Sequence, residues 1–169
     1  GLALTNDFWA EGTYATYDNE IAGMGQHTDG SVANSATSGA LTISGGLTRG
    51  NGEWLFFGHD EGDFSSYTST EIITGSGRQR LAREWVVNET NDLGAVNVSV
   101  STSDLPSGIP NPQYFLLVDS DGDADFSNAT AFPMIASGSD FIAEVDLSEG
   151  DHLAIAVEEG DDTEIWYSY

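Results

Sequence analysis

Four aspartates occupy alternate positions directly after the apolar run 115–118, where a strand is expected to end. They are Asp119, Asp121, Asp123 and Asp125. Calcium takes about six to eight oxygen ligands, and a D-x-D-x-D spacing lets a tight turn bring several carboxylates together. So much negative charge in one turn is costly unless a cation or solvent compensates it. The spacing marks this segment as a candidate calcium site.

The aspartate loop, residues 119–130, has only the first half of an EF-hand pattern. Its sixth position is Ala124, where an EF-hand loop needs glycine, and its twelfth is Thr130 in place of a bidentate glutamate. One interpretation is an inter-strand calcium site of looser geometry, completed by Asp125 or Asn128. The other is a solvated acidic turn that holds no ion. The sequence does not decide between them.

Basic residues are scarce, and most of them are close together. The chain has four arginines and no lysine against 28 acidic residues, and three of the arginines are Arg78, Arg80 and Arg83. Strand alternation places Leu81 and Trp85 on the face of Arg83, which would partly bury its guanidinium and require a carboxylate partner. The pattern favours structural ion pairs for Arg80 and Arg83 over capture of a ligand.

The composition limits the classes of partner. A formal net charge of −24 opposes binding to nucleic acid or to anionic membrane surfaces, which depends on Lys and Arg. Cations, or a saline medium that screens self-repulsion, suit such a chain better. Cysteine is absent, so thiolate metal sites and disulfides play no part. No apolar run is long enough for membrane insertion.

Enzyme signatures are missing from the sequence. It contains no G-x-S-x-G, H-E-x-x-H or phosphate loop, and no cysteine nucleophile. The three histidines, His27, His59 and His152, are far apart and are expected to be surface or turn residues. A pair such as Asp60 and Glu61 could act as glycosidase carboxylates only if the fold placed them across a cleft. We therefore expect no enzyme activity and no catalytic residues.

Apolar residues alternate with polar ones in many short runs separated by Gly, Asn, Asp and Ser, which is typical of sheets with one solvated face. The pattern predicts an all-β protein: a single β-sandwich domain over residues 1–169, with jelly-roll or Greek-key connections. Asn51-Gly52 signals a hairpin, and the proline-rich stretch 105–112 is expected to connect the two sheets. The expected strands are 7–17, 20–25, 40–44, 53–58, 69–74, 81–88, 94–101, 113–118, 131–135, 140–147, 151–157 and 163–168.

Two blocks of the sequence resemble a family. They are an R-L-x-R-x-W block and a later L-L-V-D-x-D-G-D block, matched here by Arg80, Leu81, Arg83, Trp85, Asp119, Asp121, Gly122 and Asp123. With other blocks between about residues 10 and 157, the chain resembles an uncharacterised β-sandwich domain family of large bacterial cell-surface and adhesin-like secreted proteins. The family's I-G-R-D-D block is Met24-Gly25-Gln26-His27-Thr28 here. The resemblance implies an extracellular, non-enzymatic surface module.

Residues 158–169 extend past the region of family resemblance and end in the strand-like segment IWYSY. An unpaired apolar strand is an aggregation hazard, so it must be paired or covered. It can complete its own sheet, or it can add to the sheet edge of another copy and form a filament. In the second case Ile165, Trp166, Tyr167 and Tyr169 would make the assembly contact.

The leading hypothesis is therefore a structural or adhesive β-sandwich at the cell surface or in the extracellular space. It would be either a module of a surface protein or a filament subunit assembled by strand complementation. Its partners would be other copies of itself or neighbouring modules. The alternative is a calcium-dependent module of an adhesin that binds a peptide or glycan beside the aspartate loop. The sequence identifies no residues for binding such a ligand.

Overall fold

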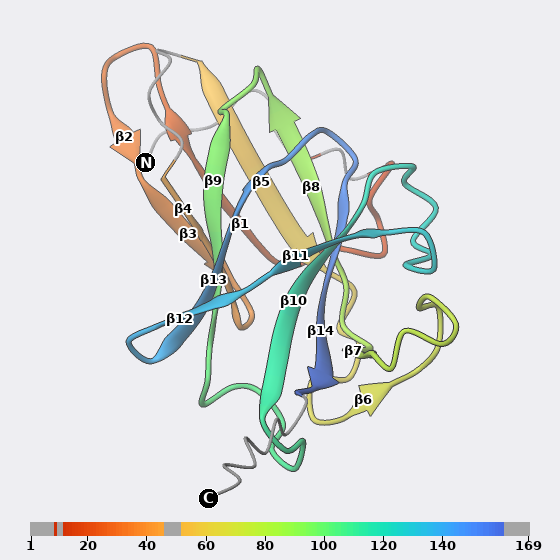
Figure 1. Ribbon diagram of the computed structural model, residues 1–169. Coiled ribbons are helices and arrows are strands. Elements are labelled where there is room, and N and C mark those ends of the chain that lie inside the picture. Colours follow the sequence, from red (N-terminus) through yellow and green to blue (C-terminus); the bar gives the residue numbers. More distant parts are fainter. Residues whose placement is uncertain (1–8, 10–11, 46–51, 161–169) are drawn as a thin grey trace, which may run out of the picture.

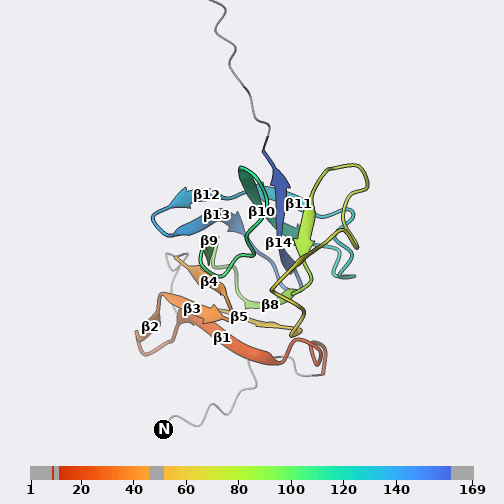
Figure 2. The same ribbon diagram turned by 90° about the horizontal axis from the view of Figure 1, so that it is seen from below.

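The computed structural model describes residues 9, 12–45 and 52–160, which form two β-sheets packed face to face (Figures 1 and 2). The predicted all-β sandwich is confirmed. The nine-stranded sheet contains, in order, β11 (Thr130–Pro133), β10 (Pro112–Asp119), β14 (His152–Glu159), β8 (Trp85–Thr90), β5 (Glu53–His59), β1 (Asn19–Gln26) and β2 (Val32–Ala33), with β7 (Gln79–Leu81) beside β14 and β6 (Tyr67–Thr68) beside β7. The five-stranded sheet contains β12 (Ile135–Ser137), β13 (Asp140–Asp146), β9 (Ala95–Ser101), β4 (Leu41–Ser44) and β3 (Ser35–Ser38).

The main core lies between the sheets and follows the alternation in the sequence. In β9, Val96, Val98 and Val100 are buried, while the polar residues between them are partly exposed. Trp85 of β8 is fully buried, and its indole Nε1–H donates to the carbonyl oxygen of Ser38 at 3.0 Å. Because that donor has a partner, the large side chain can be buried without an unsatisfied polar group.

The outer face of the nine-stranded sheet is also covered over part of its area. The residues of β14 from His152 to Val157 are all buried, so this strand has no solvated face. Ala154 and Ala156 pack in a second cluster with Phe115 and Phe126, and Phe126 comes from the aspartate loop. A continuous apolar run in place of strict alternation is what a strand covered on both faces requires.

A third cluster explains why the predicted strand 7–17 is wrong over its described residues. Trp9, Tyr14 and Tyr17 lie in bends and turns, and they pack with Val86 on the outer face of the nine-stranded sheet. Their aromatic side chains are buried in this way without the segment pairing as a strand. The alternation of apolar residues there reflects contact with a sheet and not membership of one.

Other strand boundaries also differ from the prediction. The expected strand 69–74 is a turn in which Glu71 has a φ of 52° and its carboxylate pairs with Arg80. The expected strand 81–88 is interrupted at residues 82–84, where Asp60 exchanges backbone and side-chain hydrogen bonds with Glu84. The expected strand 131–135 breaks at Met134, where the chain passes from β11 in one sheet to β12 in the other.

The connections between strands often change sheet. The stretch 105–112 joins β9 of the five-stranded sheet to β10 of the nine-stranded sheet, as predicted. The hairpin signal at Asn51-Gly52 falls partly outside the described residues; the strands on either side of it, β4 and β5, belong to different sheets, and β5 pairs with β1 and β8. Strands β2 and β3 were not predicted, and the expected strand 163–168 lies outside the described residues.

Candidate metal site

The aspartate loop connects two neighbouring strands of the nine-stranded sheet, β10 and β11, which pair antiparallel. Asp119 is the last residue of strand β10, and its side chain is buried. The chain then turns through Gly122 and Ala124, with φ values of 76° and 62°. Glycine adopts this left-handed conformation freely, whereas alanine adopts it at a cost. The sharp turn keeps the following acidic residues close to the end of β10.

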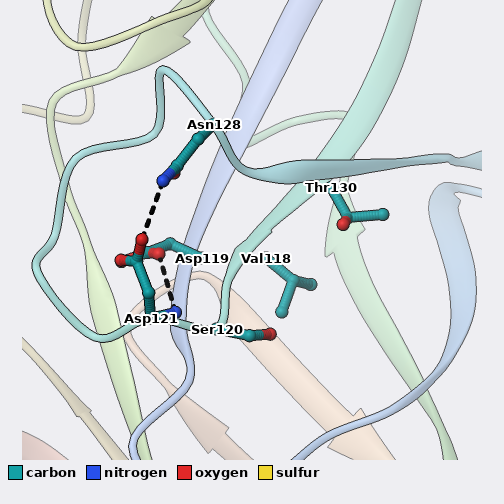
Figure 3. A pocket seen from close by; sticks show the side chains of 6 residues that line it. All are labelled: Val118, Asp119, Ser120, Asp121, Asn128 and Thr130. Carbon is teal, nitrogen blue, oxygen red and sulfur yellow. Dashed lines mark hydrogen bonds between the residues drawn. The ribbon is translucent and has the colours of Figure 1, made fainter.

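Hydrogen bonds to carboxylates hold the loop in shape. The two carboxylate oxygens of Asp119 accept from the backbone N–H groups of Asp121, at 3.2 Å, and of Ala124, at 3.0 Å. Asp121 accepts from the side-chain amide of Asn128 at 2.7 Å, so the two ends of the loop are joined (Figure 3). Asp123 accepts from the backbone N–H of Asp125 at 2.9 Å. Each of these carboxylates therefore holds the backbone N–H of the residue two positions further on, or a group elsewhere in the loop.

The structure brings three of the four candidate aspartates together. Asp119, Asp121 and Asp123 each offer a carboxylate oxygen, and these three atoms lie within 4.8 Å of one another. The group can hold a metal ion, which would be bound by oxygen ligands alone. Asp125 is not in this group; its carboxylate accepts from the backbone N–H of Ser127 at 2.9 Å instead.

The three carboxylates are in unlike electrostatic environments. Burial raises the pKa of Asp119 above its ordinary value, and the neighbouring Asp121 carboxylate adds to this. The hydrogen bond from Asn128 lowers the pKa of Asp121. A buried carboxylate beside an exposed ionised one is electrostatically unfavourable, and a bound cation would relieve this repulsion.

A cavity of about 340 Å³ adjoins the cluster, at the junction of β10 and β11 (Figure 3). Its lining consists of Val118, Asp119, Ser120, Asp121, Asn128 and Thr130. The side chains of Ser120 and Thr130 add hydroxyl oxygens to those of the aspartates. Neither residue was predicted to line a site: Thr130 is brought there by its pairing with Val118 in β10, which spacing does not show, and Ser120 lies next to Asp119 in the loop.

Two of the three histidines are buried, contrary to the expectation that all would be surface or turn residues. His152 lies opposite Asp119 in the pairing of β14 with β10, and its Nδ1 is 3.1 Å from the hydroxyl of Tyr17. Burial lowers the pKa of His152, although the nearby Asp119 opposes this shift. His59 is also buried, whereas His27 lies in a partly exposed turn. Distance along the sequence therefore did not indicate their positions.

The two arginines expected to form ion pairs differ. Arg80 is buried, with Nη2 3.0 Å from Oε1 of Glu84 and in contact with the Glu71 carboxylate. Arg83 has no carboxylate within ion-pair distance among the described residues; its Nε–H donates to the carbonyl oxygen of Gly62 at 3.0 Å, and its guanidinium lies over the ring of Phe64. Arg83 is only partly buried, because the interruption at residues 82–84 takes it out of the strand alternation.

The other candidate residues do not enter this cluster. The carboxylate of Asp60 caps the interrupted segment by accepting from the backbone N–H groups of Gly62 and Glu84. Glu61 is exposed beside it. The assembly candidates Ile165, Trp166, Tyr167 and Tyr169 lie outside the described residues.

In the part of the chain that the structure describes, no helix is long and apolar enough to cross a bilayer.

Comparison with known proteins identifies a family for this sandwich. The model of the family DUF8202, described as a domain of unknown function, matches residues 3–151. The chain belongs to this family. The DUF8202 match includes the whole aspartate loop and every strand from β1 to β13, and it stops at the residue before β14. No curated protein matches the chain, and no solved structure matches it.

Proposed function

We propose that this DUF8202 domain is a non-enzymatic, extracellular β-sandwich with a structural or adhesive role, whose aspartate loop is fixed by calcium. The observation that carries the proposal is the convergence of Asp119, Asp121 and Asp123 within 4.8 Å at the end of a buried strand. Oxygen-only ligands suit calcium, which is abundant outside cells. A bound ion would offset part of the −24 net charge where it is most concentrated.

Calcium should then raise the thermal stability of the protein, since a ligand that binds only the native state stabilises it in proportion to RT ln(1 + [L]/Kd). The test compares the melting temperature in millimolar calcium with that in EDTA. Replacing Asp121→Ala together with Asp123→Ala should abolish the difference. As a matched control, Asp104→Ala with Asp146→Ala removes the same charge outside the loop and should retain it. An unchanged melting temperature in the unsubstituted protein would reduce the loop to a solvated turn.

The second candidate function is calcium-dependent binding of a peptide or glycan beside the aspartate loop. The cavity of about 340 Å³ next to the carboxylates favours it, because a bound ion would have its open coordination positions close to a concave, partly polar surface. An array of peptides and glycans, probed with calcium and with EDTA, separates this function from the structural one. Saturable capture of one ligand class only in calcium would support it.

We also propose that the chain assembles with other copies of itself or with neighbouring modules through residues 161–169, because residues 158–160 of the expected assembly segment pair with β10 and Asn111 in the chain's own sheet. Strand β14 extends to Glu159, and the backbone N–H of Gly160 donates to the carbonyl oxygen of Asn111 at 3.0 Å. The acceptor would be the free edge at β11 and β12, each the outermost strand of its sheet on this side. Ile135 of β12 is 74% exposed there, which leaves apolar surface for an added strand.

Deleting residues 161–169 tests this assembly while keeping the Gly160 hydrogen bond. Under the proposal, light scattering of the full chain shows polymers, whereas the shortened chain is a folded monomer. A full chain that is monomeric at high concentration, with residues 165–169 protected from hydrogen exchange, would show that the segment completes its own sheet. That result would exclude the filament and leave the calcium proposal standing.

A further inference from the structure

A second polar cavity, of about 310 Å³, lies apart from the aspartate loop and is lined by Glu20, His59, Glu61 and Arg83. It is formed where β1 begins and β5 ends, together with the segment between β7 and β8. Three of the four residues are charged, and the fourth is a histidine that is only 3% exposed. This cavity has no part in the calcium proposal.

The backbone is distorted at both glutamates. A β-bulge between Asn19 and Ala22 shifts the pairing of β1 with β5, and within it Glu20 has a φ of 48°. Glu61 has a φ of 62°. Such conformations are unfavourable for residues other than glycine, and they gather where a side chain must be aimed at a site. The bulge points Glu20 at the ring of His59, with Oε2 3.3 Å from Nε2.

The His59 ring is held as a hydrogen-bond donor towards the cavity. Its Nδ1 accepts from the backbone N–H of Glu61 at 3.1 Å, so the proton of the neutral ring must be on Nε2. Nε2 therefore donates to Glu20 and has no lone pair for a metal ion. The ring also makes an edge-on contact with Trp85, and the backbone of His59 is held by the side-chain amide of Asn19, which donates to the His59 carbonyl oxygen.

Arg83 supplies the other donors. Of its guanidinium nitrogens, Nε is used by the Gly62 carbonyl oxygen, and no described carboxylate lies within 4.0 Å of the group. Arg78 and Arg80, in contrast, each pair with a glutamate. The carboxylate of Asp63 is near enough to interact with Arg83 electrostatically but forms no ion pair with it. The Nη groups of Arg83, on the wall of the cavity, are therefore available to a ligand.

The mixture of groups selects the class of ligand. Two carboxylates repel an anion, while the guanidinium and the locked Nε2–H disfavour a metal cation. A hydroxyl group both donates and accepts, so neighbouring hydroxyls can donate to Glu20 and Glu61 and accept from Arg83. We propose that this cavity binds a hexose unit of a neutral saccharide, independently of calcium. The proposal extends beyond the structural role of the domain and does not depend on the aspartate loop.

The experiment is saturation-transfer difference NMR with glucose, galactose and mannose, each at millimolar concentration and with EDTA present. At least one hexose should give a saturation-transfer signal. In spectra of the protein, the same hexose should shift the ring resonances of His59 but not those of His27 or His152. Arg83→Lys keeps the charge but loses the planar fork, and it should weaken binding by about tenfold or more. Glu61→Gln should also weaken it, and Glu144→Gln, an exposed position on the five-stranded sheet, should not.

Three results would overturn the proposal. One is the absence of any signal from all three hexoses with the folded, unsubstituted protein. Another is hexose binding that neither Arg83→Lys nor Glu61→Gln changes, because the sugar would then bind elsewhere. A His59 shift with glycine but with none of the hexoses would assign the cavity to a zwitterionic ligand. None of these results affects the calcium test, which is read at the aspartate loop.

Discussion

The Nη2 atom of Arg80 lies 3.0 Å from Oε1 of Glu84, with the two side chains 3% and 12% exposed. The hydroxyl of Tyr17 donates to the other oxygen of Glu84 at 3.1 Å. Burial nevertheless raises the pKa of Glu84, although Arg80 opposes the shift. The desolvation of this carboxylate thus outweighs the attraction of its partner, and Glu84 depends on Arg80 to be buried in its charged form.

Arg80→Met should destabilise the protein by about 3 kcal/mol at neutral pH, because it leaves Glu84 buried and charged without a cation. The pKa of Glu84 is already above its unfolded value and should rise further. Protonation of Glu84 then favours the folded state, so the loss should shrink as the pH falls below that raised pKa. Urea unfolding of both proteins between neutral and mildly acidic pH measures the difference.

Arg78→Met is the matched control for this prediction. Arg78 pairs with Glu158 at 2.9 Å, but both side chains are more exposed, at 23% and 27%. Its loss should cost less than about 1 kcal/mol, with little dependence on pH. Equal losses of stability for the two variants, or a loss for Arg80→Met that grows on acidification, would show that the buried charge of Glu84 is not the cause.

Ala124→Gly should stabilise the protein by about 1 kcal/mol. Ala124 has a φ of 62° in the aspartate loop, and alanine pays a steric cost there that glycine does not. The urea midpoint measures the gain. The same substitution at Ala136, in the extended strand β12, should instead destabilise by about 0.5 to 1 kcal/mol. A lower midpoint for Ala124→Gly would show that the loop is not in this conformation.

Trp85→Phe should cost about 2 to 4 kcal/mol. It removes the hydrogen bond to the Ser38 carbonyl oxygen and leaves a cavity at a fully buried position in the main core. Trp54→Phe, at a half-buried position of β5, should cost clearly less. Circular dichroism during urea unfolding measures both losses of stability. A comparable loss for the two variants would show that Trp85 contributes no more to the core than Trp54 does.

Stability should rise with ionic strength, because the net charge of −24 makes self-repulsion large and salt screens it. Sodium chloride and tetramethylammonium chloride should raise the urea midpoint equally if screening alone is responsible. A midpoint that does not respond to either salt would mean that bound cations already compensate the charge. A response to sodium alone would indicate specific binding of that ion.

The fold class could be predicted because alternation records which face of a strand is buried, as in Val96, Val98 and Val100. The same signal failed at Tyr14 and Tyr17, which are buried on the outer face of a sheet without belonging to it. The carboxylate cluster could be predicted from local spacing. The cavity at Glu20 and Arg83 could not, because a bulge and a strand interruption assemble it from segments far apart in the chain.

The position of β14 has a consequence for the order in which the protein can form. This strand lies inside the nine-stranded sheet, between β10 on one side and β8 and β7 on the other (Figure 1). Until residues 152–159 have left the ribosome, β10 and β11 have no link through the sheet to β8, β5 and β1. Because these pairings join distant parts of the chain, the sheet can close only after synthesis of the domain is nearly complete. The two halves of the nine-stranded sheet are therefore joined by a single strand, β14, and neither half can be connected to the other before that strand is in place.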